Sequence, residues 1–348
     1  MAAGILLDRL EINHPVIQAP MASASTPALV AAVSNAGGLG SLGAARLSPD
    51  EIRAAIPKIR AETNRAFAIN LFAPLPVVVD DAKIETARQL LEPYYREVGL
   101  GEVPMPPTKP PYSFDDQLTA VLEARPPVIS FTFNMLPLDA LRRIQATGAT
   151  LIGTATNVSE ARALEEAGVD AIVVQGSEAG GHRGTFIGPF EDSLIGLMAL
   201  VPQVASAVRV PVIAAGGIMD GRGVRAALGL GAQAAQLGTA FLGCAENTAV
   251  NPLYRAAVLN AADAATTVAR VYTGRPARMI RNRYVSEMSA HTASLPGFPI
   301  MGALTMPLAQ AAIAQGRDDL VPMLAGQGVA LTAGDSAATI LRRLVDAL

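Results

Sequence analysis

Residues 171–184 read AIVVQGSEAGGHRG, a short apolar run that leads into a loop with four glycines and a histidine. An apolar run, a turn containing Gly or Pro and an amphipathic helix follow one another repeatedly along the chain. The runs are nearly continuous in apolar residues rather than alternating, which is typical of parallel strands that helices cover on both faces. Strands that alternate with helices pair in parallel through right-handed crossovers. We therefore expect an α/β fold.

Eight apolar runs qualify as strands, and helix-capping residues follow several of them. Thr26-Pro27 and Ser48-Pro49 each place a capping hydroxyl before a proline at the first helical position, and Asn157 can cap a third helix. Eight strand–helix units in succession predict a closed (β/α)8 TIM barrel. An open doubly wound sheet stays an alternative, because hydrophobic periodicity cannot show closure. The predicted strands are Val16–Met21, Leu39–Ala44, Phe67–Phe72, Val128–Phe133, Thr150–Ala155, Ala171–Gln175, Val210–Ala215 and Ala234–Phe241.

Two stretches interrupt this rhythm. Ala73–Pro127 is rich in proline and too irregular for a single crossover. Asn247–Gly328 follows the eighth strand, and Asp335–Leu348 then supplies the helix that the barrel still needs. We predict a smaller second lobe that caps the C-terminal mouth of the barrel. The barrel would comprise residues 1–75, 116–246 and 329–348, and the lobe residues 76–115 and 247–328.

The composition limits the functional classes. The chain has 348 residues, of which 51% are hydrophobic and 16% charged, so it can bury a large core. A net charge of −3 with scattered Lys and Arg argues against nucleic-acid binding. The single cysteine, Cys244, excludes an internal disulfide and a cysteine-based metal site, which favours a reducing compartment. Met1–Arg9 lacks the pattern of a secretory signal and no apolar stretch is long enough to span a membrane, so we expect a soluble cytoplasmic protein.

Two glycine-containing loops are candidates for phosphate binding. Active sites in such barrels form on the loops after the strands, and the loops after the seventh and eighth strands often bind phosphate through backbone N–H groups. Here they contain Gly216-Gly217 and Gln236-Leu237-Gly238-Thr239. Glycine lets an anion approach the backbone closely, and Thr239 adds a hydroxyl donor. The glycines could instead only form tight turns, but two such loops at these strands favour a phosphate site.

His182 is the candidate catalytic residue among three histidines. It follows the pair Gly180-Gly181 in the loop after the sixth strand. A neutral imidazole can accept a proton near pH 7, and an imidazolium can stabilise a neighbouring anion. His14 precedes the first strand, at the structural end of the barrel, and His291 in the second lobe stays unassigned.

Four other side chains lie near the predicted barrel mouth. Met21 offers a soft apolar contact to a flat ring. Asn70 and Gln175 offer donors and acceptors to the edge of such a ring, for example that of a flavin. Glu178 is either an orienting acid or a part of the fold, and both roles stay open.

The chain closely resembles the nitronate monooxygenases, formerly called 2-nitropropane dioxygenases, and in particular their class I-like members. The resemblance spans nearly the whole chain, and Glu178–Gly184 (EAGGHRG) is its most specific element. The other matching segments are Pro15–Met21, Gly37–Gly40, Asn70–Phe72, Pro211–Gly217, Leu237–Phe241, Thr273–Arg278, Pro296–Pro299 and Ala325–Gly328.

The resemblance implies an FMN cofactor at the barrel mouth, with its phosphate on the Gly217 and Gly238–Thr239 loops and with Pro20, Met21 and His182 in the site. It also implies oxidation of alkyl nitronates by dioxygen to a carbonyl compound and nitrite, through single-electron transfer and an anionic flavosemiquinone. Propionate-3-nitronate is a candidate substrate on family grounds. In members that also accept neutral nitroalkanes, the histidine would remove the α-proton, which is worth about 10²–10⁴ in rate. A homodimer stays open.

Departures and rival families limit this assignment. Phe298 stands where the family often has tyrosine and Leu324 where tryptophan is frequent, which leaves substrate size and polarity open. The main alternative is an FMN- and NAD(P)H-dependent enoyl-acyl carrier protein reductase, but Thr185–Leu200 and the long second lobe favour nitronate oxidation. An IMP dehydrogenase-like barrel would need a cysteine near the sixth strand, whereas Cys244 follows the eighth. A flavin-binding protein without turnover is a third alternative, against which His182 argues.

Overall fold

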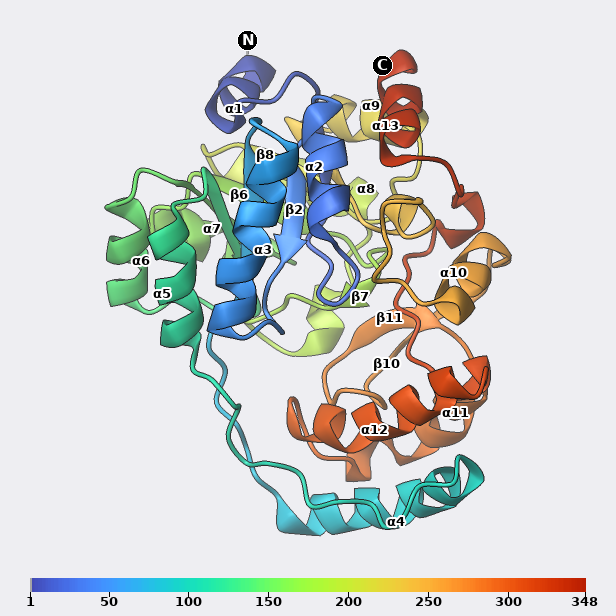
Figure 1. Cartoon of the computed structure of the whole chain (residues 1–348). Coiled ribbons are helices and arrows are strands. Elements are labelled where there is room, and N and C mark those ends of the chain that lie inside the picture. Colours follow the sequence, from blue (N-terminus) through green and yellow to red (C-terminus); the bar gives the residue numbers. More distant parts are fainter. Residues whose placement is uncertain (1) are drawn as a thin grey trace.

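The structure, a computed structural model, describes residues 2–348 and contains a barrel of eight parallel strands (Figure 1). Neighbouring strands follow the order β1-β9-β8-β6-β5-β4-β3-β2. A parallel bridge between Ile17 and Leu39 joins the two ends of this series, so the predicted closed barrel is confirmed. Met1, the first residue of the predicted barrel range, lies outside the described residues. The strands are β1 (Val16–Gln18), β2 (Gly40–Gly43), β3 (Phe67–Phe72), β4 (Val128–Thr132), β5 (Thr150–Ala155), β6 (Ala171–Gln175), β8 (Val212–Ala215) and β9 (Ala234–Leu237).

A helix follows each barrel strand before the next one begins. The predicted caps are confirmed: the side chains of Thr26, Ser48 and Asn157 each accept a backbone N–H from the first turn of their helix. Ser48 also shares a capping box with Glu51. These helices are α2 (Pro27–Asn35), α3 (Pro49–Glu62), α5 (Phe114–Ala124), α6 (Leu138–Gln145), α7 (Val158–Glu166), α8 (Leu197–Ala207), α9 (Gly221–Gly229) and α13 (Ala337–Asp346).

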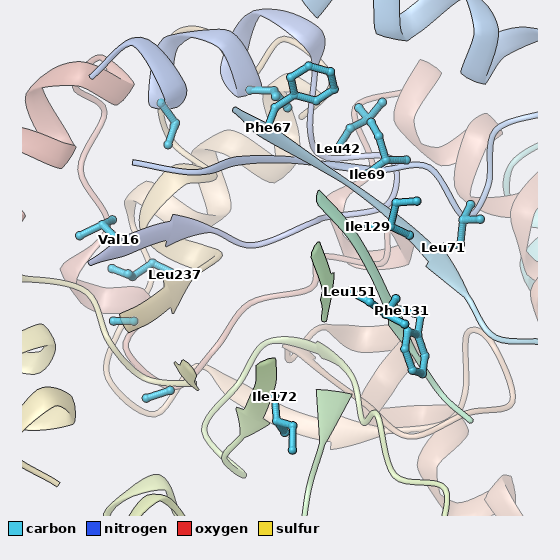
Figure 2. Close-up of a cluster of buried hydrophobic side chains, with 14 of the residues drawn as sticks. Val16, Leu42, Phe67, Ile69, Leu71, Ile129, Phe131, Leu151, Ile172 and Leu237 are labelled. Atoms are coloured by element: carbon cyan, nitrogen blue, oxygen red, sulfur yellow. The ribbon is translucent and has the colours of Figure 1, made fainter. Parts of the chain in front are cut away.

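The strands are apolar on both faces because each face meets a different part of the core. Side chains such as Val16, Ile69 and Ile129 point outward and pack beneath the helices (Figure 2). Side chains such as Ile17, Ile152 and Ile213 fill the barrel interior instead. Helix α1 (Ala2–Leu10), which sequence reasoning did not predict, adds Leu6 and Leu10 to this interior cluster. Each of these two fully buried leucines stabilises the barrel by about 2 kcal/mol.

Five predicted strands are longer than the observed ones: β2, β4 and β8 by one or two residues, and β1 and β9 by three or four. β1 ends at Gln18, so Ala19–Met21 leaves the sheet and lines the cavity described below. β9 ends at Leu237, and Thr239–Phe241 forms a short 3-10 helix, η2. Both segments stay apolar after the strand hydrogen bonds end. A prediction from hydrophobicity alone therefore places the ends of these two strands too late.

A second, three-stranded antiparallel sheet joins the barrel to the second lobe. It consists of β10 (Thr266–Ala269), β11 (Ala277–Ile280) and the two-residue strand β7 (Gly181–His182). The sequence predicted a loop at β7, since two residues carry no periodic signal. In the register of this sheet, His182 lies opposite Ala277.

The second lobe has its own hydrophobic core, to which the proline-rich insertion contributes. Tyr95 of the insertion donates its hydroxyl to the carbonyl oxygen of Leu304 at 2.7 Å, and Gln315 donates to that of Val98 at 2.7 Å. Helix α4 (Asp81–Glu97) of the insertion therefore lies against α12 (Ile300–Ala314), at the bottom of Figure 1. None of the helices in residues 2–348 has the length and apolarity needed to cross a bilayer. The helices of this region are α4 (Asp81–Glu97), α10 (Pro252–Leu259), α11 (Arg283–Met288) and α12 (Ile300–Ala314), and the remaining short 3-10 helices are η1 (Phe190–Ser193), η3 (Ser289–Ser294), η4 (Asp318–Leu320) and η5 (Val329–Leu331).

Candidate active site

A cavity of about 360 Å³ lies between the carboxyl ends of the barrel strands and the second lobe. Its walls come from the loops after the strands, together with segments of the lobe such as Thr273 and Gly326. The structure places every site residue expected from the sequence on this one cavity. These residues are Pro20, Met21, Asn70, Gln175, Gly180, Gly181, His182, Gly216, Gly217, Gln236, Gly238 and Thr239.

The loops after β8 and β9 form a backbone cradle at one end of the cavity. Gly216 and Gly217 have φ angles of 132° and 67°, in the region that favours glycine. Within the described residues, the N–H groups of Gly217 and Gly238 donate to no backbone oxygen. Unpaired N–H groups on adjacent glycine loops form an anion-binding concavity. The cradle therefore suits a phosphate group.

A segment of the second lobe, Ala325–Gly328, closes this cradle, and sequence reasoning did not assign it to the site. The Gly326 N–H donates to the Thr239 hydroxyl oxygen at 2.9 Å. A Cβ on Gly180 would lie 2.5 Å from the Gly326 nitrogen, so neither backbone tolerates a side chain there. The segment did appear among the family-like stretches, but nothing in the sequence shows what it packs against.

Two hydrogen bonds from the side chain of Gln175 position His182. The Gln175 amide nitrogen donates to the His182 carbonyl oxygen at 3.0 Å, and its amide oxygen accepts the Gly184 N–H at 2.8 Å. The end of β6 thus holds both sides of the histidine, while β11 pairs with its backbone. Gln175 therefore orients His182 in addition to lining the cavity.

The imidazole of His182 lies in an apolar and positively charged environment. Its Nε2 atom is 2.9 Å from the Thr273 hydroxyl oxygen. The rings of Phe133 and Phe298 pack edge-to-face against it, with centroid distances of 5.7 and 5.9 Å. Burial, and then the charges of Arg46 and Arg275, lower the pKa of His182 to about 3. The histidine is therefore neutral near pH 7, the state in which an imidazole can accept a proton.

The charge of the cavity is carried by a single arginine. Among the described residues that line it, Arg46 is the one permanently charged side chain, and no aspartate or glutamate is present. Arg46 follows β2 and makes no side-chain hydrogen bond or ion pair with the described residues, although its carbonyl oxygen accepts the Tyr112 hydroxyl at 2.6 Å. Sequence reasoning missed it, because one arginine after a strand carries no distinguishing pattern. The cavity consequently favours anionic ligands over cationic ones.

The remaining sequence candidates lie outside the cavity lining. The Glu178 carboxylate accepts the N–H of Leu197, the first residue of α8, at 2.8 Å, so it supports the fold. His14 packs against Gly37 below the barrel. His291 is exposed on η3.

A buried carboxylate that the sequence analysis overlooked, Glu160, fixes the segment after the histidine loop. Glu160 is 0% exposed and accepts the N–H groups of Phe186 and Ile187 at 2.5 and 2.9 Å. It also accepts the Thr156 N–H and hydroxyl at 2.6 and 2.8 Å. Its place on α7 looks like an ordinary solvent-facing position in the sequence, so burial there was not predictable.

Comparisons with known proteins agree along the whole chain. A family model described as nitronate monooxygenase matches residues 4–347. A probable nitronate monooxygenase from Staphylococcus aureus (strain Newman) is 40% identical over 342 residues, which cover 98% of this chain and 96% of the relative. A nitroalkane oxidase structure from Streptomyces ansochromogenes has a TM-score of 0.91 at 36% identity and covers 99% of this chain and 97% of that chain. FabK from Thermotoga maritima has a TM-score of 0.77 at 29% identity, with 99% and 95% coverage.

Proposed function

The chain belongs to the nitronate monooxygenase family, whose members are flavin-dependent oxidoreductases, and from this premise we propose that it binds FMN and oxidises alkyl nitronates with dioxygen to a carbonyl compound and nitrite. One observation carries the proposal. Beside a glycine cradle for phosphate, the cavity combines the cation Arg46 with a neutral His182 and contains no carboxylate. An anionic nitronate is attracted to such a site, whereas a cationic substrate is not.

The cradle and the cavity walls fit FMN. Gly217 and Gly238 offer unpaired N–H groups to the phosphate. Asn70 donates to the Ser130 hydroxyl oxygen at 3.0 Å, which leaves its amide oxygen available to the edge of a flavin ring. Met21 lies near Gly238 and offers its sulfur to the ring face. The bound flavin would supply the redox chemistry, accepting electrons from the nitronate and passing them to dioxygen.

His182 would act as a neutral hydrogen-bonding group and, toward neutral nitroalkanes, as a base. The Thr273 hydroxyl forms a hydrogen bond with Nε2 of His182. When this hydroxyl donates its own proton to the Arg275 carbonyl oxygen, at 3.3 Å, it accepts the bond from Nε2. In that arrangement Nε2 carries the proton and Nδ1 keeps the lone pair that can take an α-proton. A nitronate has already lost this proton and needs no base.

Because only neutral nitroalkanes need His182 as a base, the two substrate classes give a direct test on the flavin-loaded enzyme. His182→Asn should reduce turnover of nitroethane by about 10²–10⁴ and should reduce turnover of ethyl nitronate much less. Nitrite release and oxygen consumption measure both reactions. His291→Asn, an exposed histidine of the lobe, is the matched control and should change neither rate. If His182→Asn lowers the turnover of nitroethane and of ethyl nitronate equally, the proposed role of His182 as a base is wrong.

A second experiment separates nitronate oxidation from NAD(P)H-dependent enoyl reduction. Absorbance of the bound flavin is followed without oxygen while ethyl nitronate or NADH is added. We expect nitronate to remove the absorbance of the oxidised flavin and NADH to leave it nearly unchanged. Rapid bleaching by NADH with no effect of nitronate would overturn the proposal.

Arg46 points to an acidic nitronate, such as the metabolic poison propionate-3-nitronate, as the substrate. A guanidinium without a partner carboxylate can bind the carboxylate of such a substrate through two parallel hydrogen bonds. Arg46→Gln should therefore raise KM for propionate-3-nitronate more than KM for ethyl nitronate. An equal change in KM for both substrates would contradict the proposal of an acidic substrate, but it would not contradict nitronate oxidation itself.

A further inference from the structure

A second cavity of about 290 Å³ lies behind the wall that carries His182. Arg183, Arg270 and Arg275 line it, together with the rings of Phe190 and Phe298. Within the described residues, no aspartate or glutamate lines this cavity. We call it the arginine recess. Three arginines beside one small cavity produce a positive local potential.

The recess and the active-site cavity share a wall but open to different sides of it. His182 lines the active-site cavity, and the next residue, Arg183, lines the recess. Thr273 likewise lines the first cavity and Arg275 the second. Successive residues of an extended segment point to opposite faces, which explains the division between His182 and Arg183. A ligand in the recess would thus lie close to His182 without occupying the substrate cavity.

The protein leaves the charge in the recess largely unpaired. The Arg275 guanidinium donates to the carbonyl oxygens of Arg183 and Thr185 at 3.0 and 2.6 Å. The Arg270 guanidinium stacks 5.5 Å from the Phe190 ring centre and, within residues 2–348, has no hydrogen bond or ion pair. Carbonyl oxygens and rings orient a guanidinium but do not neutralise it.

Arg183 is the most unusual of the three arginines. It is 1% exposed, and it donates to the carbonyl oxygens of Gly176 and Ser193 at 2.6 and 2.7 Å. Its Nε atom is buried with no hydrogen-bond partner in the described chain. A buried N–H of a charged group without an acceptor costs about 1–3 kcal/mol or more, and a bound ion is one of the features that account for such a group.

The carboxylates that act on these arginines form no ion pair with them. Glu178 acts on Arg183, and Glu160 acts on Arg183 and Arg275, only through space. The oxygens of Glu160 are already occupied by the N–H groups of Thr156, Phe186 and Ile187. Burial lowers the pKa of Arg183 and of Arg275 to about 10, so both stay protonated at pH 7. The recess is therefore a fixed cationic site.

We propose that the arginine recess binds a small oxyanion of the carboxylate or phosphate class, separate from both the flavin phosphate and the nitronate. Arg270 and Arg275 bind the anion directly, and the buried Arg183 supplies additional positive potential. The occupant neutralises charge behind His182, so it also modulates the active site. The binding itself does not depend on the substrate proposed above.

Inorganic phosphate added to the flavin-saturated holoenzyme tests the site. At about ten times its dissociation constant, phosphate should raise the folded-to-unfolded ratio about elevenfold, read as an increase in thermal midpoint over a matched chloride series. Arg270→Gln should abolish this increase while keeping flavin content and ethyl nitronate turnover in phosphate-free buffer. Arg281→Gln, an exposed arginine of the same lobe, should keep the increase. The same increase in Arg270→Gln would overturn the proposal.

A kinetic arm distinguishes a free anion from the acidic end of a substrate. If the recess takes a free oxyanion, phosphate changes the turnover of ethyl nitronate and propionate-3-nitronate alike. If phosphate competes with propionate-3-nitronate but does not affect ethyl nitronate, the recess holds the substrate carboxylate. That result would overturn the proposal of a separate anion site. Because thermal midpoints report binding without turnover, failure of the nitronate reaction leaves this test intact.

Discussion

Replacing His182 with asparagine should reduce the acid sensitivity of the folded protein. The folded state holds His182 neutral because burial and the charges of Arg46 and Arg275 lower its pKa to about 3. In the unfolded chain the imidazole titrates near its ordinary pKa of about 6.5. Below that pH the unfolded state binds a proton that the folded state does not. The folded protein therefore loses stability as the pH falls from about 6.5 toward 3.

The magnitude follows from the gap between the two pKa values. Each pH unit below the unfolded pKa costs about 1.4 kcal/mol, so pH 5 should cost about 2 kcal/mol relative to a residue that does not titrate. At pH 7 the corresponding cost is only about 0.2 kcal/mol. The free energy of unfolding of the wild type should thus fall between pH 7 and pH 5 by about 2 kcal/mol more than that of His182→Asn.

Urea unfolding at pH 7 and pH 5, at one fixed flavin concentration, measures this difference. A loss of unfolding free energy that the variant shows equally at both pH values cancels, because only the change with pH is compared. His291→Asn is the control and should follow the wild type, since that side chain is exposed in the folded protein. Parallel pH dependences of wild type and His182→Asn would show that His182 titrates normally, and would refute the electrostatic description of the site.

Three further changes test other parts of the structure. Gly180→Ala places a Cβ 2.5 Å from the Gly326 nitrogen, so we expect a loss of about 1–3 kcal/mol in unfolding free energy and a lower flavin content after purification. Glu160→Gln removes an acceptor from buried N–H groups and should cost about 3 kcal/mol in urea unfolding; an unchanged midpoint would contradict its role. Cys244 is 0% exposed and burial raises the pKa of its thiol to about 12, so a thiol reagent should label it only after denaturant is added.

The barrel was predictable because its physical cause is visible in the sequence. β3, β5 and β6 begin and end where the apolar runs do, since helices bury one face of these strands and the barrel interior buries the other. Helix caps were equally readable, because a hydroxyl or amide before the first turn acts locally. The largest errors lie at β1 and β9, where an apolar segment continues past the ladder into the cavity wall.

The candidate site was predictable only in its barrel half. The position of a loop after a strand places Gly217, Gly238 and His182 at one mouth regardless of their partners. Thr273 and Gly326 depend instead on how the lobe packs on that mouth, which no local pattern encodes, whereas Arg46 follows β2 at the same mouth without a distinguishing pattern. Two of these three lie in family-like stretches of the sequence, which marked them as special without locating them.

The second lobe completes the active site rather than merely covering it. β11 pairs with Gly181–His182, and the Arg278 guanidinium on the same strand donates twice to the Ser177 carbonyl oxygen, at 3.0 and 2.9 Å. The lobe therefore holds the histidine loop at both of its ends, while Gln175 holds it from the barrel. Since Thr273 reaches the imidazole from this lobe as well, the orientation of His182 is set jointly by two hydrophobic cores. The same lobe supplies Gly326, which donates to Thr239 of the phosphate loop, so both halves of the site depend on it.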